Sequence, residues 1–96
     1  YLRAQIEAGV QAIQIFDTWA GILTKEDYNK YAFPYVSCIF RGLEGLGIPG
    51  IYFVYDGGHL LESLPGSGAD VIGLDWRTDI ETAISRLGPD VTVQGN

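Results

Sequence analysis

Polar side chains follow four apolar segments of this sequence directly, and these polar residues are the ones best placed to do chemistry. Asp17 and Thr18 come after Ala12–Phe16, and three later apolar runs end in Asp56-Gly57-Gly58, Asp75-Trp76 and Gln94-Gly95-Asn96. A carboxylate can accept hydrogen bonds or move protons, and a hydroxyl can bind a carboxylate. Because the carboxyl ends of parallel strands meet at one edge, the pattern predicts a parallel sheet with a site at that rim.

Strands and helices are expected to alternate along the chain. The predicted strands are Ala12–Phe16, Ile51–Tyr55, Val71–Leu74 and Val91–Val93. A β-α-β-α order favours a parallel α/β sheet, and no G-x-G-x-x-G follows a strand, which favours a barrel over an open nucleotide-binding sheet. A (β/α)8 barrel needs roughly 250 residues. We therefore expect a fragment of a (β/α)8 TIM barrel, about four parallel strands alternating with helices, incomplete at both ends.

The helices between these strands show start signals and apolar stripes. Leu2–Ala8 reads as the end of a helix, and a short one is expected at about His59–Leu64. Thr24 is a predicted N-cap paired with Asp27, and Pro34 predicts a kink. Thr78 or Asp79 is expected to cap the last helix. The residues expected to face inward are Tyr28, Tyr31, Ala32, Tyr35, Val36, Ile39, Phe40 and Leu43, then Ile80, Ala83, Ile84 and Leu87.

Composition narrows the class of protein. The 96 residues are 47% hydrophobic with a net charge of −6, which is typical of a globular domain. Six scattered Lys and Arg residues argue against nucleic-acid binding, and no apolar run approaches the roughly 20 residues of a membrane span. No signal peptide is visible, and the sequence does not begin with Met. The single cysteine, Cys38, is expected to be a buried small hydrophobe in a reducing compartment, so a cytoplasmic location is predicted.

Three ordered motifs resemble the uroporphyrinogen decarboxylase family. They are Phe16-Asp17-Thr18-Trp19-Ala20-Gly21, Gly73-Leu74-Asp75-Trp76 and Val93-Gln94-Gly95-Asn96. The resemblance covers essentially the whole chain and implies a single (β/α)8 barrel, of which residues 1–96 would supply strands four to seven. It implies an enzyme that uses no metal or organic cofactor and removes the carboxyl groups of four acetate side chains of uroporphyrinogen. It also implies a tetrapyrrole substrate and admits a homodimer.

The resemblance assigns two substrate-binding residues here. Thr18 corresponds to a hydroxyl that contacts substrate, and Phe16 to an aromatic residue that lines the cleft. The family's arginine loop, aspartate, tyrosine and histidine lie on other strands, so no catalytic residue is expected in these 96 residues. His59 follows the fifth strand and is not that histidine. The tetrapyrrole substrate carries eight carboxylates, and the sequence has no basic cluster to bind them. The isolated chain is therefore expected to be inactive.

The other polar and aromatic residues are expected to be structural. Asp17 is predicted to accept hydrogen bonds from loop N–H groups or to pair with an arginine, with an acid–base role as the alternative, and Asp75 to form an ion pair. Asp56 is predicted to form a turn, and His59 to sit at the rim or at the start of a helix. Thr18 itself could instead satisfy loop backbone. Packing roles are expected for Trp19, Trp76, Tyr28, Tyr31, Tyr35 and Tyr52, and the two tryptophans could alternatively wall the cleft.

Two other functions remain open from the sequence. One is a corrinoid-dependent methyltransferase on the same barrel, which would use zinc held by His and Cys. Cys38 in mid-helix and His59 on its own give that reading no support. The other is a standalone small α/β binding domain, which would leave two sheet edges open to aggregation.

Overall fold

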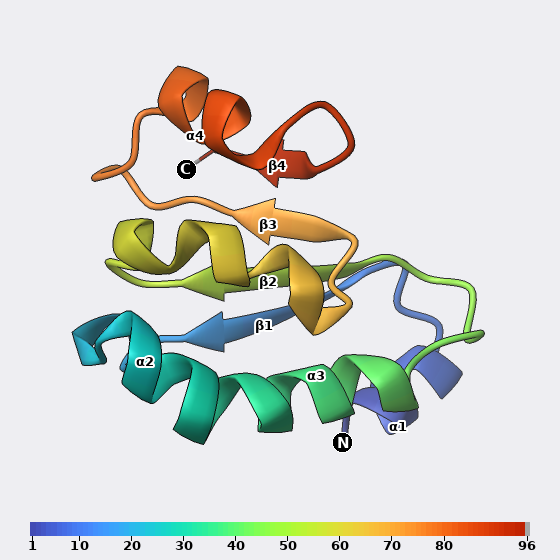
Figure 1. Ribbon diagram of the computed structural model, residues 1–96. Coiled ribbons are helices and arrows are strands. Elements are labelled where there is room, and N and C mark those ends of the chain that lie inside the picture. Colours follow the sequence, from blue (N-terminus) through green and yellow to red (C-terminus); the bar gives the residue numbers. More distant parts are fainter. Residues whose placement is uncertain (96) are drawn as a thin grey trace.

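A four-stranded parallel sheet forms the centre of the protein. The computed structural model describes residues 1–95, with strands β1 (Ile13–Asp17), β2 (Gly50–Val54), β3 (Val71–Gly73) and β4 (Thr92–Gln94) in the order β1-β2-β3-β4. All four strands run in the same direction (Figure 1). The predicted number, order and direction of the strands are confirmed.

The strand boundaries differ from the prediction by about one residue. The carboxylate of Asp70 accepts the Gly50 N–H at 2.8 Å, which starts β2 at a residue with no apolar side chain. At the other end, the Asp17 carbonyl accepts the Tyr55 N–H at 3.0 Å, so β1 extends onto the polar residue. Backbone hydrogen bonding sets both strand ends. The prediction used the apolar side chains, which the sequence shows, and it therefore missed each end by one residue.

Helices connect every pair of strands. The α-helices are α1 (Leu2–Glu7), α2 (Lys25–Asp27), α3 (Phe33–Gly42) and α4 (Ile80–Leu87), and η2 (Tyr28–Ala32) is π-helical. The 3₁₀ helices are η1 (Ala20–Ile22), η3 (Gly58–Ser63) and η4 (Pro65–Ser67). The helix expected at 59–64 is therefore 3₁₀. The predicted caps are present, because Thr24 Oγ1 accepts the Asp27 N–H at 3.1 Å and Asp79 Oδ2 accepts the Thr82 N–H at 2.9 Å.

The kink expected at Pro34 takes the form of a wide turn. Pro34 has no N–H to donate to the carbonyl of Lys30, and its ring crowds that carbonyl. The chain widens into the π-helical segment η2 immediately before it, and a new α-helix, α3, starts with Pro34 in its first turn. A π-helical turn of this kind is a common response to an interrupted ladder. The segment places Tyr28, fully buried, against the sheet.

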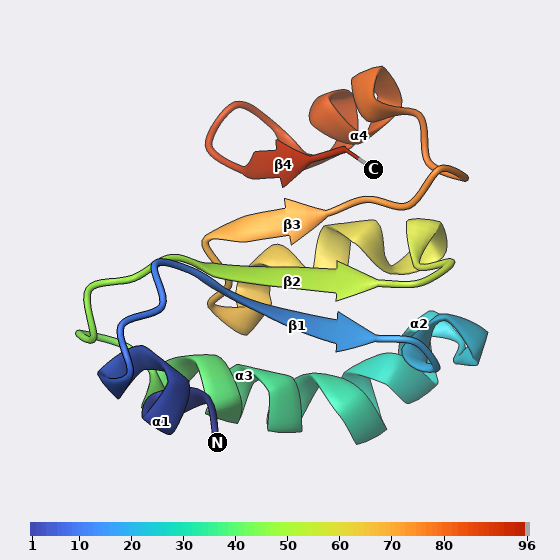
Figure 2. The ribbon, with the colours of Figure 1, turned by 180° about the vertical axis from the view of Figure 1, so that it is seen from behind.

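One face of the sheet carries the hydrophobic core. Tyr52 and Val54 of β2 are buried among Leu60, Leu61 and Ile72, with η3 and η4 lying over this face in Figure 1. Figure 2 shows the opposite face, with the strands in front of η3 and η4. On β2 the two residues of that face, Ile51 and Phe53, are only half-buried. Within residues 1–95, helices therefore cover one face of the sheet and leave the other open.

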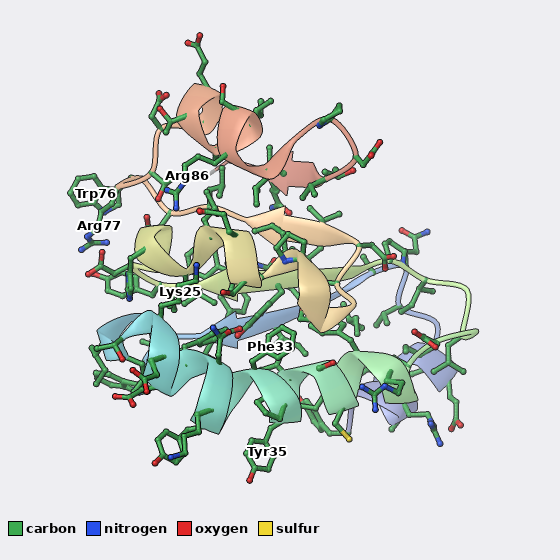
Figure 3. The ribbon with its side chains drawn as sticks, viewed as in Figure 1. Lys25, Phe33, Tyr35, Trp76, Arg77 and Arg86 are labelled. Atoms are coloured by element: carbon green, nitrogen blue, oxygen red, sulfur yellow. The ribbon has the colours of Figure 1, made fainter. Side chains whose placement is uncertain are left out.

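The predicted apolar stripe on the long helix is too wide. Val36 and Phe40 are buried, but Tyr35 is 70% exposed and points away from the sheet, whereas Phe33 points toward it (Figure 3). Tyr35 and Ile39 each precede a buried residue, which turns them about 100° round the helix. Other residues expected inside that are exposed are Tyr31, Ile80, Ile84 and Cys38.

Within residues 1–95 no helix is long and apolar enough to cross a membrane.

Candidate functional site

The carboxyl ends of the strands form a connected rim. The loop after β1 touches the loop after β2, because Gly21 lies so close to the Tyr55 carbonyl that an added Cβ would sit 2.0 Å from that oxygen. The loop after β2 is bonded to the loop after β3, because Asp75 Oδ2 accepts the Asp56 N–H at 2.6 Å. Figure 3 shows Trp76 and Arg77 beyond the end of β3. The sequence prediction of a polar rim is confirmed.

A groove lies on the open face of the sheet next to this rim. Its volume is about 270 Å³, and Phe16 and Phe53 line it together with Gln14 and Gln94. Phe16 is 68% exposed, and its ring centroid lies 5.6 Å from that of Phe53. A side chain at Gly73 would press against Phe53, since a Cβ there would come within 3.1 Å of that ring. The groove therefore offers two neighbouring aromatic rings, tilted by 58° to each other, to a ligand.

Thr18 is exposed and lies two residues after Phe16, which is the spacing of residues on one face of a strand. Among residues 1–95 no hydrogen bond engages its hydroxyl. The alternative prediction was that Thr18 satisfies the loop backbone. In the structure the neighbouring Asp17 binds the loop, because its Oδ1 accepts the Ala20 N–H at 2.9 Å. The Thr18 hydroxyl is thus left available to a ligand.

Asp17 is held from the core side as well. Its Oδ2 accepts the Tyr52 hydroxyl at 3.4 Å, and the Tyr52 oxygen lies 2.9 Å from that of Tyr28. Burial raises the pKa of both tyrosines, and the hydrogen bond between them raises that of Tyr52 further. The prediction that Asp17 accepts loop N–H groups is confirmed. Its tyrosine partners were not predicted, although a hydroxyl in the middle of an apolar strand was visible in the sequence.

A second carboxylate, Asp75, organises the other half of the rim. It is buried, and Oδ1 accepts the Arg77 N–H at 3.0 Å while Oδ2 accepts Arg77 Nη1 at 3.2 Å. Arg77 also donates to the Tyr55 hydroxyl at 2.7 Å and lies 3.7 Å from the carboxylate of Asp56. The predicted ion pair of Asp75 is confirmed. Asp56 has φ of +54°, so its predicted turn role is confirmed too.

Comparison with known proteins agrees with this geometry. The family described as "Uroporphyrinogen decarboxylase (URO-D)" matches residues 1–96. The chain belongs to this family. Proteins named uroporphyrinogen decarboxylase from Pelobacter propionicus and Carboxydothermus hydrogenoformans are 53% and 48% identical to it over 96 residues. One from Hydrogenovibrio crunogenus is 50% identical over 100 aligned positions. All of this chain is covered, but only 27–28% of each relative.

Membership of the uroporphyrinogen decarboxylase family confirms the fold class. The observed sheet is a four-stranded part of a (β/α)₈ TIM barrel, and the chain spans just over a quarter of the length of the curated relatives it matches. A larger cavity of about 470 Å³, lined by Ile13, Phe40 and Asp70, lies at the amino ends of the strands. In TIM barrels, active sites lie at the carboxyl face, so the rim and its groove are the candidate site for the family's chemistry.

His59 occupies a structural position on the rim. It is exposed, and its Nε2 donates to the Leu23 carbonyl at 2.7 Å, which fastens η3 to the loop after β1. The prediction of a rim histidine is confirmed. Among residues 1–95 no three His, Cys, Asp or Glu side chains lie together as metal ligands would. That the whole protein uses neither metal nor organic cofactor stays a prediction.

The two tryptophans at the rim differ from expectation. Trp19 and Trp76 were predicted to pack, but they are 75% and 74% exposed in the described part of the chain. The Arg77 guanidinium lies 4.6 Å from the Trp76 ring and 4.5 Å from the Tyr55 ring. The sequence showed that Arg77 lies close to Asp75, but it did not reveal the contacts of Arg77 with the Tyr55 and Trp76 rings. Asn96, the last residue of the third motif, lies outside the described residues.

Proposed function

We propose that the whole protein containing this chain removes the four acetate carboxyl groups of uroporphyrinogen III and releases coproporphyrinogen III, with neither metal nor organic cofactor. Residues 1–96 would form strands four to seven of one barrel. We also propose that the whole protein is a cytoplasmic enzyme and that it forms a homodimer. The observation that carries it is the exposed pair Phe16 and Thr18 beside an aromatic groove at the carboxyl rim.

Each of these two residues has chemistry that suits a tetrapyrrole. The exposed ring of Phe16 can lie against an apolar pyrrole face, as aromatic pairs do. The hydroxyl of Thr18 can donate a hydrogen bond to an acetate or propionate carboxylate at the mouth of the groove. Both contacts orient substrate, and neither residue holds a proton suited to acid–base work.

Loss of CO₂ from a pyrrole acetate requires a proton on the ring, which provides an electron sink for the breaking carbon–carbon bond. Two carboxylates of the described rim, Asp17 and Asp75, each accept hydrogen bonds from loop N–H groups, and a third, Asp56, lies 3.7 Å from Arg77. The one rim arginine, Arg77, is bonded to Asp75 and Tyr55. We therefore assign the proton donor and the cations that bind eight carboxylates to other strands, and the isolated chain is expected to be inactive.

The first test is a substitution at Thr18 in the full-length protein. The protein is assayed anaerobically with uroporphyrinogen III and without added metal. Thr18→Val keeps the shape of the side chain but removes the hydroxyl. Because hydrogen bonds to charged groups contribute about 1.5–3 kcal/mol, KM should rise at least tenfold. Since the contact is present before and during reaction, kcat should change little.

Thr92→Val is the matched control. Thr92 is an exposed threonine on β4, at the amino end of the sheet, so the same change there should leave KM unaltered. An unchanged KM in Thr18→Val would contradict the substrate-binding role. Activity found only with zinc and a corrinoid methyl donor would favour the methyltransferase reading. A native protein of about this chain's length would favour a standalone binding domain.

A further inference from the structure

A buried polar chain runs from the wide turn of the long helix to the site loop. It comprises Tyr28, Tyr52 and Asp17, and it ends at the Ala20 N–H. Both tyrosines are fully buried. The hydroxyl oxygens lie 2.9 Å apart, and Tyr52 Oη lies 3.4 Å from Asp17 Oδ2. Thr18 lies between Asp17 and Ala20, in the loop that the Asp17–Ala20 hydrogen bond closes.

The direction of the hydrogen bonds in this chain follows from counting protons. An ionised Asp17 can only accept, so Tyr52 gives it its single proton. The Tyr52 oxygen is then free to accept, so Tyr28 must be the donor of the bond between the two hydroxyls. Burial raises the pKa of both tyrosines above the ordinary value of 10.0, so both hydroxyls keep their protons near neutral pH.

Apolar side chains could fill the space of the two tyrosines without placing hydroxyls in the core. The residues on either side of Tyr52 in the sheet are apolar. In the sheet register Tyr52 stands between Ile15 of β1 and Ile72 of β3. A buried hydroxyl must find a partner or it destabilises the fold, so its presence ties the geometry of three separate elements together. The elements are η2, β2 and the loop after β1.

We propose that Tyr52, held by Tyr28, is a positioning residue for substrate binding: through Asp17 it fixes the loop that presents the Thr18 hydroxyl to the substrate. This inference rests on the proposed function. Asp17 is the connecting group, since one carboxylate oxygen faces Tyr52 and the other binds the Ala20 N–H. Loss of the Tyr52 hydroxyl would release one side of Asp17 and let the loop adopt other geometries.

The test is a double-mutant cycle in the full-length protein, with KM and kcat for uroporphyrinogen III as readouts. At 3.4 Å the Tyr52–Asp17 contact is long for an O–H···O bond. We therefore expect Tyr52→Phe to raise KM only about fivefold, with kcat nearly unchanged. In the Thr18→Val background the same change should alter KM less than about twofold, because the hydroxyl to be positioned is already gone.

Two further variants keep the test sharp. Tyr28→Phe leaves the Tyr52–Asp17 bond in place and should raise KM less than Tyr52→Phe does. Tyr35→Phe removes a hydroxyl from the exposed side of α3 and is the matched control, expected to leave KM unaltered. Amide hydrogen exchange at Ala20 should become faster in Tyr52→Phe and stay unchanged in Tyr35→Phe.

The outcomes separate the inference from the function on which it rests. An active parent protein in which Tyr52→Phe changes KM equally in both backgrounds would overturn the positioning role, as would an unchanged KM. A general stabilising role would change the melting temperature without coupling to Thr18. A correctly folded full-length protein that does not decarboxylate uroporphyrinogen III would overturn the proposed function, and the inference with it.

Discussion

The two faces of the sheet use aromatic residues in opposite ways. Tyr52 on the helix-covered face is fully buried, whereas Phe16 on the open face is 68% exposed, although their strands are direct neighbours. Both residues sit in apolar strand sequences that read alike. The comparison teaches that, within residues 1–95, the helix-covered face contains the hydrophobic core, while the open face near the rim carries exposed aromatic surface.

Polar groups follow the same division. The hydroxyls of the covered face, those of Tyr28 and Tyr52, are bonded to each other and to Asp17. The hydroxyl on the side of the groove, that of Thr18, has no hydrogen-bond partner among residues 1–95. A buried hydroxyl without a partner would cost stability, whereas an exposed one binds water until a ligand replaces it. Satisfied polar groups thus lie in the core, and the Thr18 hydroxyl without a partner among residues 1–95 lies at the candidate site.

The largest expected effect comes from truncating one aromatic residue on each face of the full-length protein. Tyr52→Ala should lower the free energy of unfolding by about 3–5 kcal/mol, as large-to-small changes in a core do. Phe16→Ala should cost less than about 1 kcal/mol but raise KM for uroporphyrinogen III. Denaturant unfolding and steady-state kinetics measure the two quantities. If Phe16→Ala destabilises as much as Tyr52→Ala, then Phe16 packs inside the closed barrel and does not line the cleft.

Sequence patterns predicted most of the fold, and their failures have physical causes. Strand order and polar strand ends came from apolar runs, and Asp79 and Thr24 from cap chemistry. The exposed Tyr35 was misplaced because an apolar stripe shows which residues are hydrophobic but not how wide a face is covered. Chain neighbours do not reveal the Tyr28–Tyr52 pair, because those hydroxyls meet across 24 positions in the sequence.

The site was predictable to a similar extent. Phe16 and Thr18 were assigned through family resemblance, and the fold places both at the rim, while their contact with substrate remains a prediction. Cys38 was expected inside because free cysteines usually are, yet it lies exposed on α3. The groove itself could not be read from the sequence, because its wall combines β1, β2 and β4 with the space above Gly73.

A smaller effect is expected where the rim loops touch. Gly21→Ala would place a methyl group 2.0 Å from the Tyr55 carbonyl oxygen, and backbone cannot turn aside as a side chain can. We expect the free energy of unfolding to fall by about 3 kcal/mol, the upper range for overpacking. Because the loops of Thr18 and Tyr55 would separate, KM should rise as well.

Gly42→Ala provides the control for that change. Gly42 ends α3, and an added Cβ meets no atom within 4 Å. Alanine there should stabilise the protein by about 0.5–1 kcal/mol, since it restricts the unfolded chain and favours the helix. Thermal unfolding of both variants measures the difference. Equal behaviour of the two glycine variants would mean that the rim loops do not meet closely in the whole protein.

The last prediction concerns the pH dependence of stability that the two buried hydroxyls produce. Burial raises the pKa of Tyr28 and Tyr52 above the model-compound value of 10.0, so the folded protein keeps protons that the unfolded chain loses above that pH. The stabilisation is complete below about pH 10 and is lost as pH rises further. Each tyrosine should lower the free energy of unfolding by up to about 1.4 kcal/mol per pH unit in that range.

Tyr52→Phe removes one of these two groups, so its stability should decline less steeply between pH 10 and 11 than that of the parent protein. Denaturant unfolding at several pH values measures the slope, and absorbance of tyrosinate shows whether ionisation of the buried pair coincides with unfolding. Parallel curves for the two proteins would mean that Tyr52 ionises as readily in the folded protein as in the unfolded chain. The hydroxyl would then not be sealed on the covered face, and the contrast between the two faces of the sheet would not hold.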